Sequence, residues 1–198
     1  MSKPLLLLTG ATGRFGRKFL ETYRDGYRFA VLGRERDRAQ SPIAHLLLPD
    51  DHHLTADLAQ PDLPARLAEQ IAGLPFVSRV INAAADTRFL GDVAALDGRR
   101  GDFSEQFAVN VYGPAVLCAL LFEAQWKDRP LARDPVCVLN LSSSSGSVVH
   151  AGCGQASYAG SKAALNMISF HMAEEYRPYN IKVNYIIRPV FLGHVEAD

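Results

Sequence analysis

The chain has 198 residues, and its 21 Lys and Arg residues balance 21 Asp and Glu residues, so the formal net charge is zero at pH 7. This balance argues against a nucleic-acid-binding protein or a membrane-surface protein, because both need an excess of basic residues. With 48% hydrophobic and 21% charged residues, the composition is that of a folded globular chain, and the length predicts one domain over residues 1–198.

Short apolar runs alternate with helical patterns along the whole chain. Strands are predicted at residues 5–9, 27–32, 54–56, 79–83, 136–141 and 181–187. Helices are predicted at residues 14–23, 64–71, 104–125 and 157–176, and loops at residues 33–42, 49–62, 86–103, 127–135 and 142–156. This alternation favours parallel pairing, and uninterrupted apolar strands indicate a sheet that is covered on both faces. The sequence therefore predicts an α/β fold, a doubly wound parallel sheet flanked by helices on both faces.

A glycine-rich turn joins the first predicted strand to the first predicted helix. Its residues, in chain order, are Thr9, Gly10, Ala11, Thr12, Gly13, Arg14, Phe15 and Gly16. Glycines here permit a tight turn and a close approach of the main chain to a pyrophosphate. The helix that follows presents unpaired N–H groups and a partial positive charge to a phosphate. In this strand–turn–helix context the pattern predicts a dinucleotide-binding site.

The end of the second predicted strand bears on the choice between NADP and NAD. A carboxylate at this point would receive the ribose hydroxyls of NAD, but the strand leads into Gly33 and Arg34. The guanidinium groups of Arg34 and Arg14 favour a 2′-phosphate, and therefore NADP. Glu35 is placed to neutralise Arg34, and the arginines of this segment would also suit a solvated surface. NAD therefore stays as the alternative cofactor.

Tyr158 and Lys162 are four residues apart at the start of the last predicted helix, so they project from one helical face. A tyrosine acts as a general acid or base at neutral pH only if its pKa falls from about 10, at a cost of roughly 4 kcal/mol. A cation about 4 Å away supplies a similar energy at an effective dielectric constant of about 20. Lys162 is suited to this task, and a hydroxyl from the preceding run of serines would hold a substrate oxygen.

Together, the glycine turn, the strand that ends in serines and the Tyr158–Lys162 pair resemble the short-chain dehydrogenase/reductase superfamily. The resemblance extends from Leu5 to about Leu192, and it implies a Rossmann fold and oxidoreductase activity. It implies a catalytic role for Tyr158 and Lys162, and a supporting role in the proton relay for Asn110. It assigns cofactor contacts to Gly10, Gly13, Gly16, Asp57, Leu58, Asn82, Ala83, Ala84, Tyr158, Lys162 and Pro189. It also implies a homodimer through helices 104–125 and 157–176.

The sequence leaves the catalytic serine open between two residues. The strand register, with Gly146 three residues later, favours Ser143. Counting back from Tyr158 favours Ser145, which lies 13 residues earlier. The glycine spacing is that of the family's extended or atypical branches. The chain stops at Asp198, whereas family members normally continue to a seventh strand, so we expect the sheet to lack its usual last strand.

The leading hypothesis is an NADP(H)-dependent oxidoreductase that transfers hydride between the nicotinamide and a small-molecule carbonyl or alcohol, with Tyr158 as general acid/base. One alternative is a catalytically inactive nucleotide-binding regulator or partner protein on the same fold. Another is an epimerase or dehydratase that uses NAD and returns it unchanged.

Nothing in the sequence predicts a targeting segment, a membrane span or a metal site. The N-terminal apolar run is too short for a signal peptide, and no uninterrupted apolar run approaches about 18 residues. Three cysteines without metal-ligand spacing indicate a reducing compartment. His52 and His53, and the pair His171 and Glu174, lack a convincing third ligand. We therefore expect a cytoplasmic protein with no metal, no membrane contact and no nucleic-acid partner.

Overall fold

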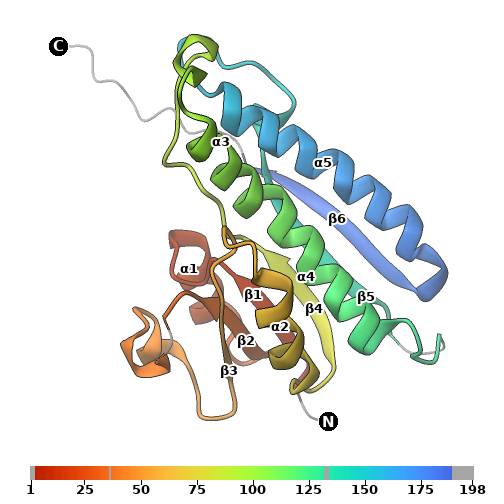
Figure 1. The fold of residues 1–198 in the computed structure, drawn as a ribbon. Coiled ribbons are helices and arrows are strands. Elements are labelled where there is room, and N and C mark those ends of the chain that lie inside the picture. Colours follow the sequence, from red (N-terminus) through yellow and green to blue (C-terminus); the bar gives the residue numbers. More distant parts are fainter. Residues whose placement is uncertain (1–2, 36, 132–133, 189–198) are drawn as a thin grey trace.

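A computed structural model describes residues 3–35, 37–131 and 134–188, whose strands form one parallel sheet (Figure 1). The strand order is β3-β2-β1-β4-β5-β6, and every neighbouring pair is parallel. The strands are β1 (Leu5–Thr9), β2 (Arg28–Gly33), β3 (His52–Thr55), β4 (Val77–Asn82), β5 (Val136–Ser143) and β6 (Ile181–Arg188). This confirms the predicted doubly wound sheet. Within the described residues the sheet ends at β6 on one side and β3 on the other.

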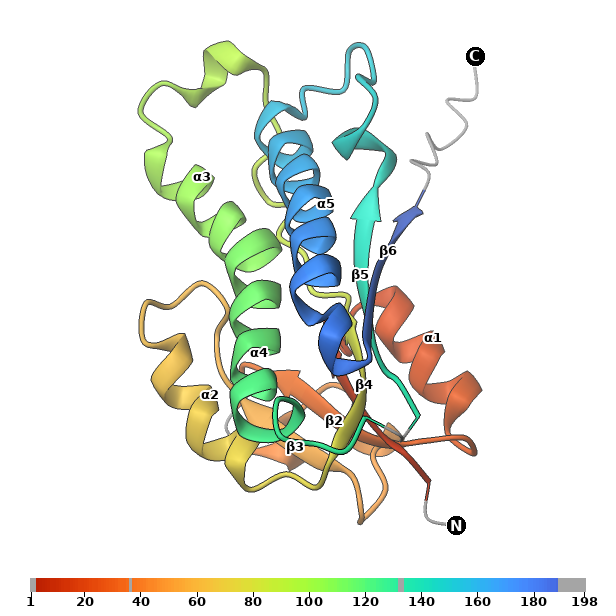
Figure 2. The ribbon, with the colours of Figure 1, turned by 90° about the vertical axis from the view of Figure 1, so that its right-hand side faces the viewer.

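Helices cover both faces of the sheet, with α1 on one side and α2, α4 and α5 on the other (Figure 2). The α-helices are α1 (Arg14–Tyr23), α2 (Leu63–Ala72), α3 (Arg100–Phe107), α4 (Gly113–Leu121) and α5 (Ala156–Tyr176). The run of leucines in β1 is uninterrupted because successive side chains point to opposite faces of the sheet, and both faces are covered. Leu5 and Leu7 lie in the core beneath α2 and α4, and Leu6 and Leu8 lie in the core with Leu20 of α1.

The helix predicted at 104–125 is longer than expected and is interrupted by two π-helical segments. It begins at Arg100, so part of the predicted loop 86–103 is helical, and it continues through Ala108–Tyr112 and Phe122–Trp126, which are π-helical. The stretch Arg100–Trp126 contains a window of 18 residues with a mean hydropathy of 1.6, so by length and composition it meets the criterion for a membrane span, although no span was predicted. A helix that packs over a sheet can be equally long and apolar. Here Leu117 and Leu121 are buried in the core between the helix and the sheet.

Several strand boundaries differ from the prediction by one or two residues, and two of these differences have a clear reason. Strand β3 begins at His52, not at residue 54, because His52 and His53 pair with β2. Strand β5 continues into the serine run, where Ser142 and Ser143 pair with the end of β6. Polar residues are therefore carried by the sheet itself to the edge where the strands end, which a pattern of apolar residues does not reveal.

Candidate active site

A cleft of about 770 Å³ opens at the carboxyl edge of the sheet. Residues that follow β1, β2, β3 and β4 line it, together with the end of β5 and the first turns of α5. This is the edge at which open α/β sheets bind their ligands. Of the residues predicted to contact a cofactor, those at the cleft are Gly10, Thr12, Gly13, Arg14, Phe15, Arg34, Asp57, Leu58, Ala83, Ala84, Tyr158 and Lys162.

The glycine turn packs directly on the segment that follows β4. Gly10 has a φ of +69°, and a Cβ atom there would lie 2.6 Å from the main chain of Ala83 and Ala84. The Thr9 hydroxyl accepts hydrogen bonds from the amides of Ala83 and Ala84, each at 3.1 Å. The turn therefore needs glycine, and Gly13, Arg14 and Phe15 at the start of α1 line the cleft, where a helix N-terminus favours a phosphate. This cradle and the size of the cleft fit a dinucleotide.

Two of the described residues that were predicted to contact the cofactor, Gly16 and Asn82, do not line the cleft. Gly16 lies behind the turn, where a Cβ atom would come within 2.4 Å of the Gly10 carbonyl oxygen. Asn82 is buried under the cleft, and its amide donates to Asn140 Oδ1 at 2.8 Å. Pro189 lies outside the described residues. Gly16 and Asn82 thus shape the cleft from behind, without a surface exposed to it.

Opposite charges meet where β2 ends. Arg14 and Arg34 are exposed on the cleft wall. Glu35 lines the same wall, and its carboxylate turns back over Gly33, 3.0 Å from the position that a Cβ atom would take there. Burial lowers the pKa of neighbouring His53. This part of the cleft wall therefore carries two guanidinium groups next to the Glu35 carboxylate.

The first turns of α5 bring Tyr158 and Lys162 to the cleft. Lys162 is 2% exposed, and its ammonium group donates to the Leu141 carbonyl oxygen at 2.8 Å. Its nitrogen lies 5.8 Å from the centre of the Tyr158 ring. Burial lowers the pKa of Lys162 to about 8. The structure thus places a buried lysine beside a half-buried tyrosine at the cleft.

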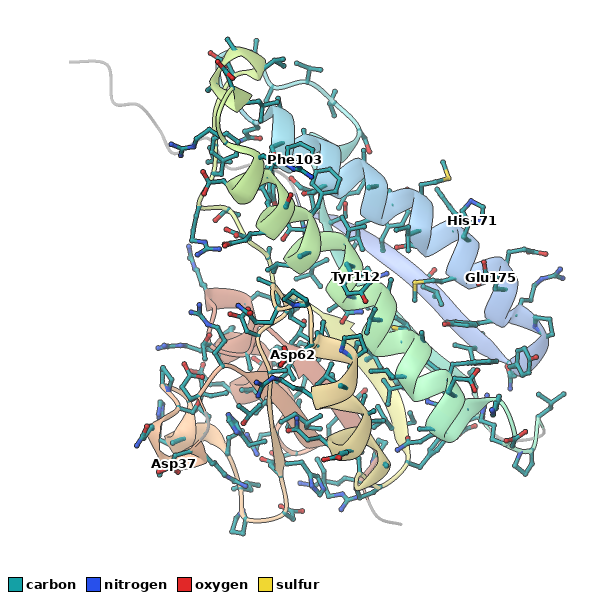
Figure 3. All side chains as sticks on the ribbon, in the orientation of Figure 1. Asp37, Asp62, Phe103, Tyr112, His171 and Glu175 are labelled. Atoms are coloured by element: carbon teal, nitrogen blue, oxygen red, sulfur yellow. The ribbon has the colours of Figure 1, made fainter. Side chains whose placement is uncertain are left out.

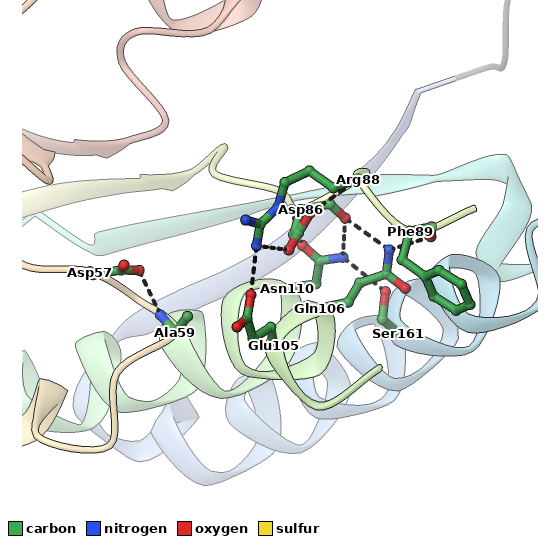
Figure 4. A network of polar contacts seen from close by, with 9 residues as sticks. All are labelled: Asp57, Ala59, Asp86, Arg88, Phe89, Glu105, Gln106, Asn110 and Ser161. Atoms are coloured by element: carbon green, nitrogen blue, oxygen red, sulfur yellow. Dashed lines mark hydrogen bonds and ion pairs between the residues drawn. The ribbon is translucent and has the colours of Figure 1, made fainter. Parts of the chain in front are cut away.

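Asn110 connects the segment after β4 to the helix that carries Tyr158 (Figure 4). The side chain lies in the π-helical segment, a feature often found at functional sites. Its amide nitrogen donates to the Asp86 carbonyl at 3.1 Å and to Ser161 Oγ at 3.0 Å, and its oxygen accepts from the Asp86 amide at 2.6 Å. Ser161 Oγ donates in turn to the Tyr158 carbonyl at 2.7 Å.

A network of ion pairs between acidic and basic side chains at the cleft was not predicted from the sequence. Arg88 Nη2 lies 2.6 Å from Asp86 Oδ2 and 2.9 Å from Glu105 Oε2 (Figure 4). The Arg88 guanidinium holds the pKa of the Asp86 carboxyl below its usual range. All three residues line the cleft. The run of charged residues after β4 was the one sequence signal for this network. It could not identify the contact with Glu105, because Glu105 belongs to α3.

The two candidate serines are buried side by side at the end of β5. Ser143 and Ser145 are 4% and 6% exposed, and their hydroxyl oxygens are 3.3 Å apart. Ser145 also donates to Gln155 Oε1 at 2.7 Å, a partner that the sequence analysis did not identify. Neither serine is among the residues that line the cleft. The structure therefore brings both serines together next to Ser142, which does line the cleft, and leaves the choice between them open.

Within residues 3–35, 37–131 and 134–188, no three His, Cys, Asp or Glu side chains are grouped to hold a metal ion. The polar residues of the cleft are instead suited to a dinucleotide and to proton transfer.

Comparison with known proteins agrees with this geometry. Protein FixR of Bradyrhizobium diazoefficiens is 28% identical over 190 residues, which are 92% of this chain and 65% of FixR. A short-chain dehydrogenase from Streptomyces avermitilis has a TM-score of 0.79 at 24% identity, covering 100% of this chain and 70% of that one. An oxidoreductase of the same family from Brucella ovis, in complex with a partially ordered NAD, has a TM-score of 0.72 at 25% identity, covering 94% and 83%.

The chain thus spans about two thirds of the length of the curated relative that it matches. The sequence model of the short chain dehydrogenase family matches residues 5–196. The match includes every strand of the sheet, the glycine turn and the Tyr158–Lys162 pair. The chain therefore belongs to the short chain dehydrogenase family.

Proposed function

We propose that this protein is an NADP(H)-dependent oxidoreductase that interconverts a small-molecule carbonyl and its alcohol, with Tyr158 as general acid/base. The observation that carries the proposal is the placement of Tyr158 and buried Lys162 on one cleft wall, facing a glycine turn that fits a dinucleotide. A bound nicotinamide cofactor supplies or accepts the hydride.

The residues of the chain account for the movement of the proton. In reduction, the Tyr158 hydroxyl gives its proton to the substrate oxygen, and in oxidation the tyrosinate takes it back. Lys162 stabilises the tyrosinate by its charge, so it lowers the tyrosine pKa. Ser143 or Ser145 orients the substrate oxygen, and Asn110 supports the relay by holding the first turns of α5 through Ser161.

Preference for NADP rests on Arg14 and Arg34, whose guanidinium groups suit a 2′-phosphate. Glu35 opposes this preference, because its carboxylate lies where ribose hydroxyls are bound in NAD-dependent proteins. NAD is present in the Brucella ovis relative. We place the arginines first because both are exposed to the cleft, while Glu35 is partly covered.

The assembly that we propose is a homodimer through the two long helices predicted at residues 104–125 and 157–176, in the cytoplasm. Tyr112 projects from the outer face of the long helix (Figure 3), and it is 48% exposed. Met167 and Phe170 of α5 are 58% and 57% exposed. Large apolar side chains on two adjacent helices give a surface suited to self-association.

The test is a titration with NADPH and NADH, following nicotinamide fluorescence. We expect NADPH to bind at least about tenfold more tightly, and the Arg34→Ala variant to lose most of this difference. Glu35→Ala should instead weaken NADH. Arg177→Ala, which removes an exposed guanidinium at the far end of α5, is the matched control. Failure of both cofactors to bind at millimolar concentration would favour the nucleotide-independent role of a partner protein.

A further inference from the structure

The candidate serines form a chain of hydrogen bonds that ends on Gln155. Ser143 Oγ donates to Ser145 Oγ at 3.3 Å, and Ser145 Oγ donates to Gln155 Oε1 at 2.7 Å. The Ser145 amide donates back to Ser143 Oγ at 3.2 Å. The Gln155 side chain therefore accepts the hydrogen at the end of the pair, and it decides where both hydroxyl hydrogens point.

The main chain of Gln155 is held by a distant segment. Gln155 directly precedes α5, its carbonyl accepts from the Ala159 amide at 2.7 Å, and it pairs with Gly91 in a parallel bridge. The Ala156 amide donates to the Gly91 carbonyl at 3.4 Å. A Cβ atom on Gly154 would lie 3.4 Å from the Gly91 carbonyl carbon, so glycine lets the two segments approach.

We define residues 86–92, between β4 and the turn that precedes α3, as the strap. One end of the strap is held by Asn110 through Asp86, and the other end pairs with Gln155. The Gln106 amide also donates to the carbonyls of Asp86 and Phe89, at 3.2 and 2.9 Å (Figure 4). The strap thus connects the asparagine that supports Tyr158 with the glutamine that supports the serines.

The chemistry of an amide explains why glutamine suits this position. An amide offers an acceptor oxygen and a donor nitrogen at the same reach. With the oxygen toward Ser145, the hydroxyl hydrogens point to Gln155, and the serines offer lone pairs to an alcohol hydroxyl. With the nitrogen toward Ser145, the serine hydrogens are released, and the pair can donate to a carbonyl oxygen.

We propose that Gln155 is the positioning residue of the serine pair, and that its amide lets the pair donate to a carbonyl in one direction and accept from an alcohol in the other. This inference rests on the proposed function for its substrate. The contact itself does not, so the two can be tested separately.

The contact is tested without turnover, by placing a titratable group at the position. In Gln155→Glu, the carboxyl pKa is measured by ¹³C NMR with and without a second change, Ser145→Ala. A hydrogen bond from Ser145 lowers a carboxyl pKa, so we expect a higher carboxyl pKa in the double variant. Other titratable groups near this position are Asp92 beside Gly154 and His150 on Ser144, and they are the same in both variants. Equal pKa values in the two variants would overturn the proposal.

The role is tested by reduction of 4-nitrobenzaldehyde with NADPH. In Gln155→Glu, deprotonation leaves only acceptor oxygens, so we expect kcat to fall about tenfold as pH rises through the carboxyl titration, near pH 4 to 6. Neither the unaltered protein nor Gln40→Glu, an exposed charge control, should show this break. A Gln155→Glu profile that matches the unaltered protein would refute the role.

A double-mutant cycle separates positioning from a loss of fold. Gln155→Met keeps the length of the side chain and removes the amide, and we expect it to lower kcat about tenfold. In a Ser145→Ala background the same change should have little effect, because the hydroxyl it positions is gone. An equal loss in both backgrounds would show a merely structural role. If the Ser145 contact is found but the unaltered protein reduces no carbonyl, the proposed function fails, and the positioning role of Gln155 in the reaction fails with it.

Discussion

The turn after β1 and the loop after β5 lie at the same edge of the sheet but are held in place in different ways. The turn is fixed by its main chain, because Gly10 and Gly16 leave no room for side chains. The end of β5 and the loop that follows it are instead fixed by side chains, such as Asn166 of α5 on Ser142 and Gln155, which directly precedes α5, on Ser145. A main-chain site of this kind should be sensitive to added atoms, whereas a side-chain site should be sensitive to lost hydrogen bonds.

The largest expected effect on turnover comes from a side-chain change in α5, which follows this loop. Tyr158→Phe removes the proton donor and keeps the ring, so we expect kcat to fall by about 10³-fold or more. Affinity for NADPH should change little, because the glycine turn is untouched. Steady-state kinetics and fluorescence titration measure the two quantities. A variant that keeps full turnover would remove Tyr158 from the mechanism.

The matching change at the main-chain site is Gly10→Ala. The added Cβ atom meets the main chain at 2.6 Å, and a φ of +69° costs a non-glycine residue about 1–2 kcal/mol. We expect a loss of about 3 kcal/mol in the free energy of unfolding and at least tenfold weaker NADPH binding. Urea denaturation and fluorescence titration test this. Unchanged cofactor affinity would mean that the turn does not hold the dinucleotide.

This contrast also explains how much the sequence could predict. The strands, the glycine turn and the Tyr158–Lys162 pair depend on neighbours within one element, so local spacing identifies them. The contact between Ser145 and Gln155, and the network of Asp86, Arg88 and Glu105, depend on how separate elements pack. No periodicity in the sequence encodes such contacts.

The boundaries that were missed follow the same rule. The helix was expected to start at residue 104, but it starts at Arg100 in a segment whose charged residues resemble a loop. Strand β5 was expected to end at residue 141, but its serines pair with β6. In both cases tertiary contacts overrode the local pattern.

Lys162 is needed for the proposed chemistry, but burial of its ammonium group costs stability. Its pKa is about 8 in the folded protein against 10.5 as the reference value, so the unfolded chain binds the extra proton between these pH values. Stability should therefore rise with pH from about 8 to about 10.5. The shift corresponds to about 3 kcal/mol carried as a penalty below pH 8.

Lys162→Met should remove this penalty and the activity together. The lost hydrogen bond to the Leu141 carbonyl offsets about 1 kcal/mol, so we expect the variant to be about 2 kcal/mol more stable at pH 7. Near pH 10.5 the order should reverse, because the unaltered lysine is then neutral and keeps its hydrogen bond. Urea denaturation at both pH values measures the difference. A difference that does not depend on pH would show that Lys162 titrates normally in the fold.

The smallest effect separates crowding from backbone conformation, the two causes combined at Gly10. Gly98 has a φ of +71° but no atom within 4 Å of an added Cβ, and Gly101 of α3 has open space without a positive φ. Gly98→Ala should cost about 1–2 kcal/mol. Gly101→Ala should stabilise the fold by about 0.5–1 kcal/mol, since alanine restricts the unfolded chain and favours a helix. Thermal unfolding checks both, with a rise of about 1–3 °C for Gly101→Ala. If Gly10→Ala costs no more than Gly98→Ala, conformation alone explains the turn, and its close contact with Ala83 carries no energy.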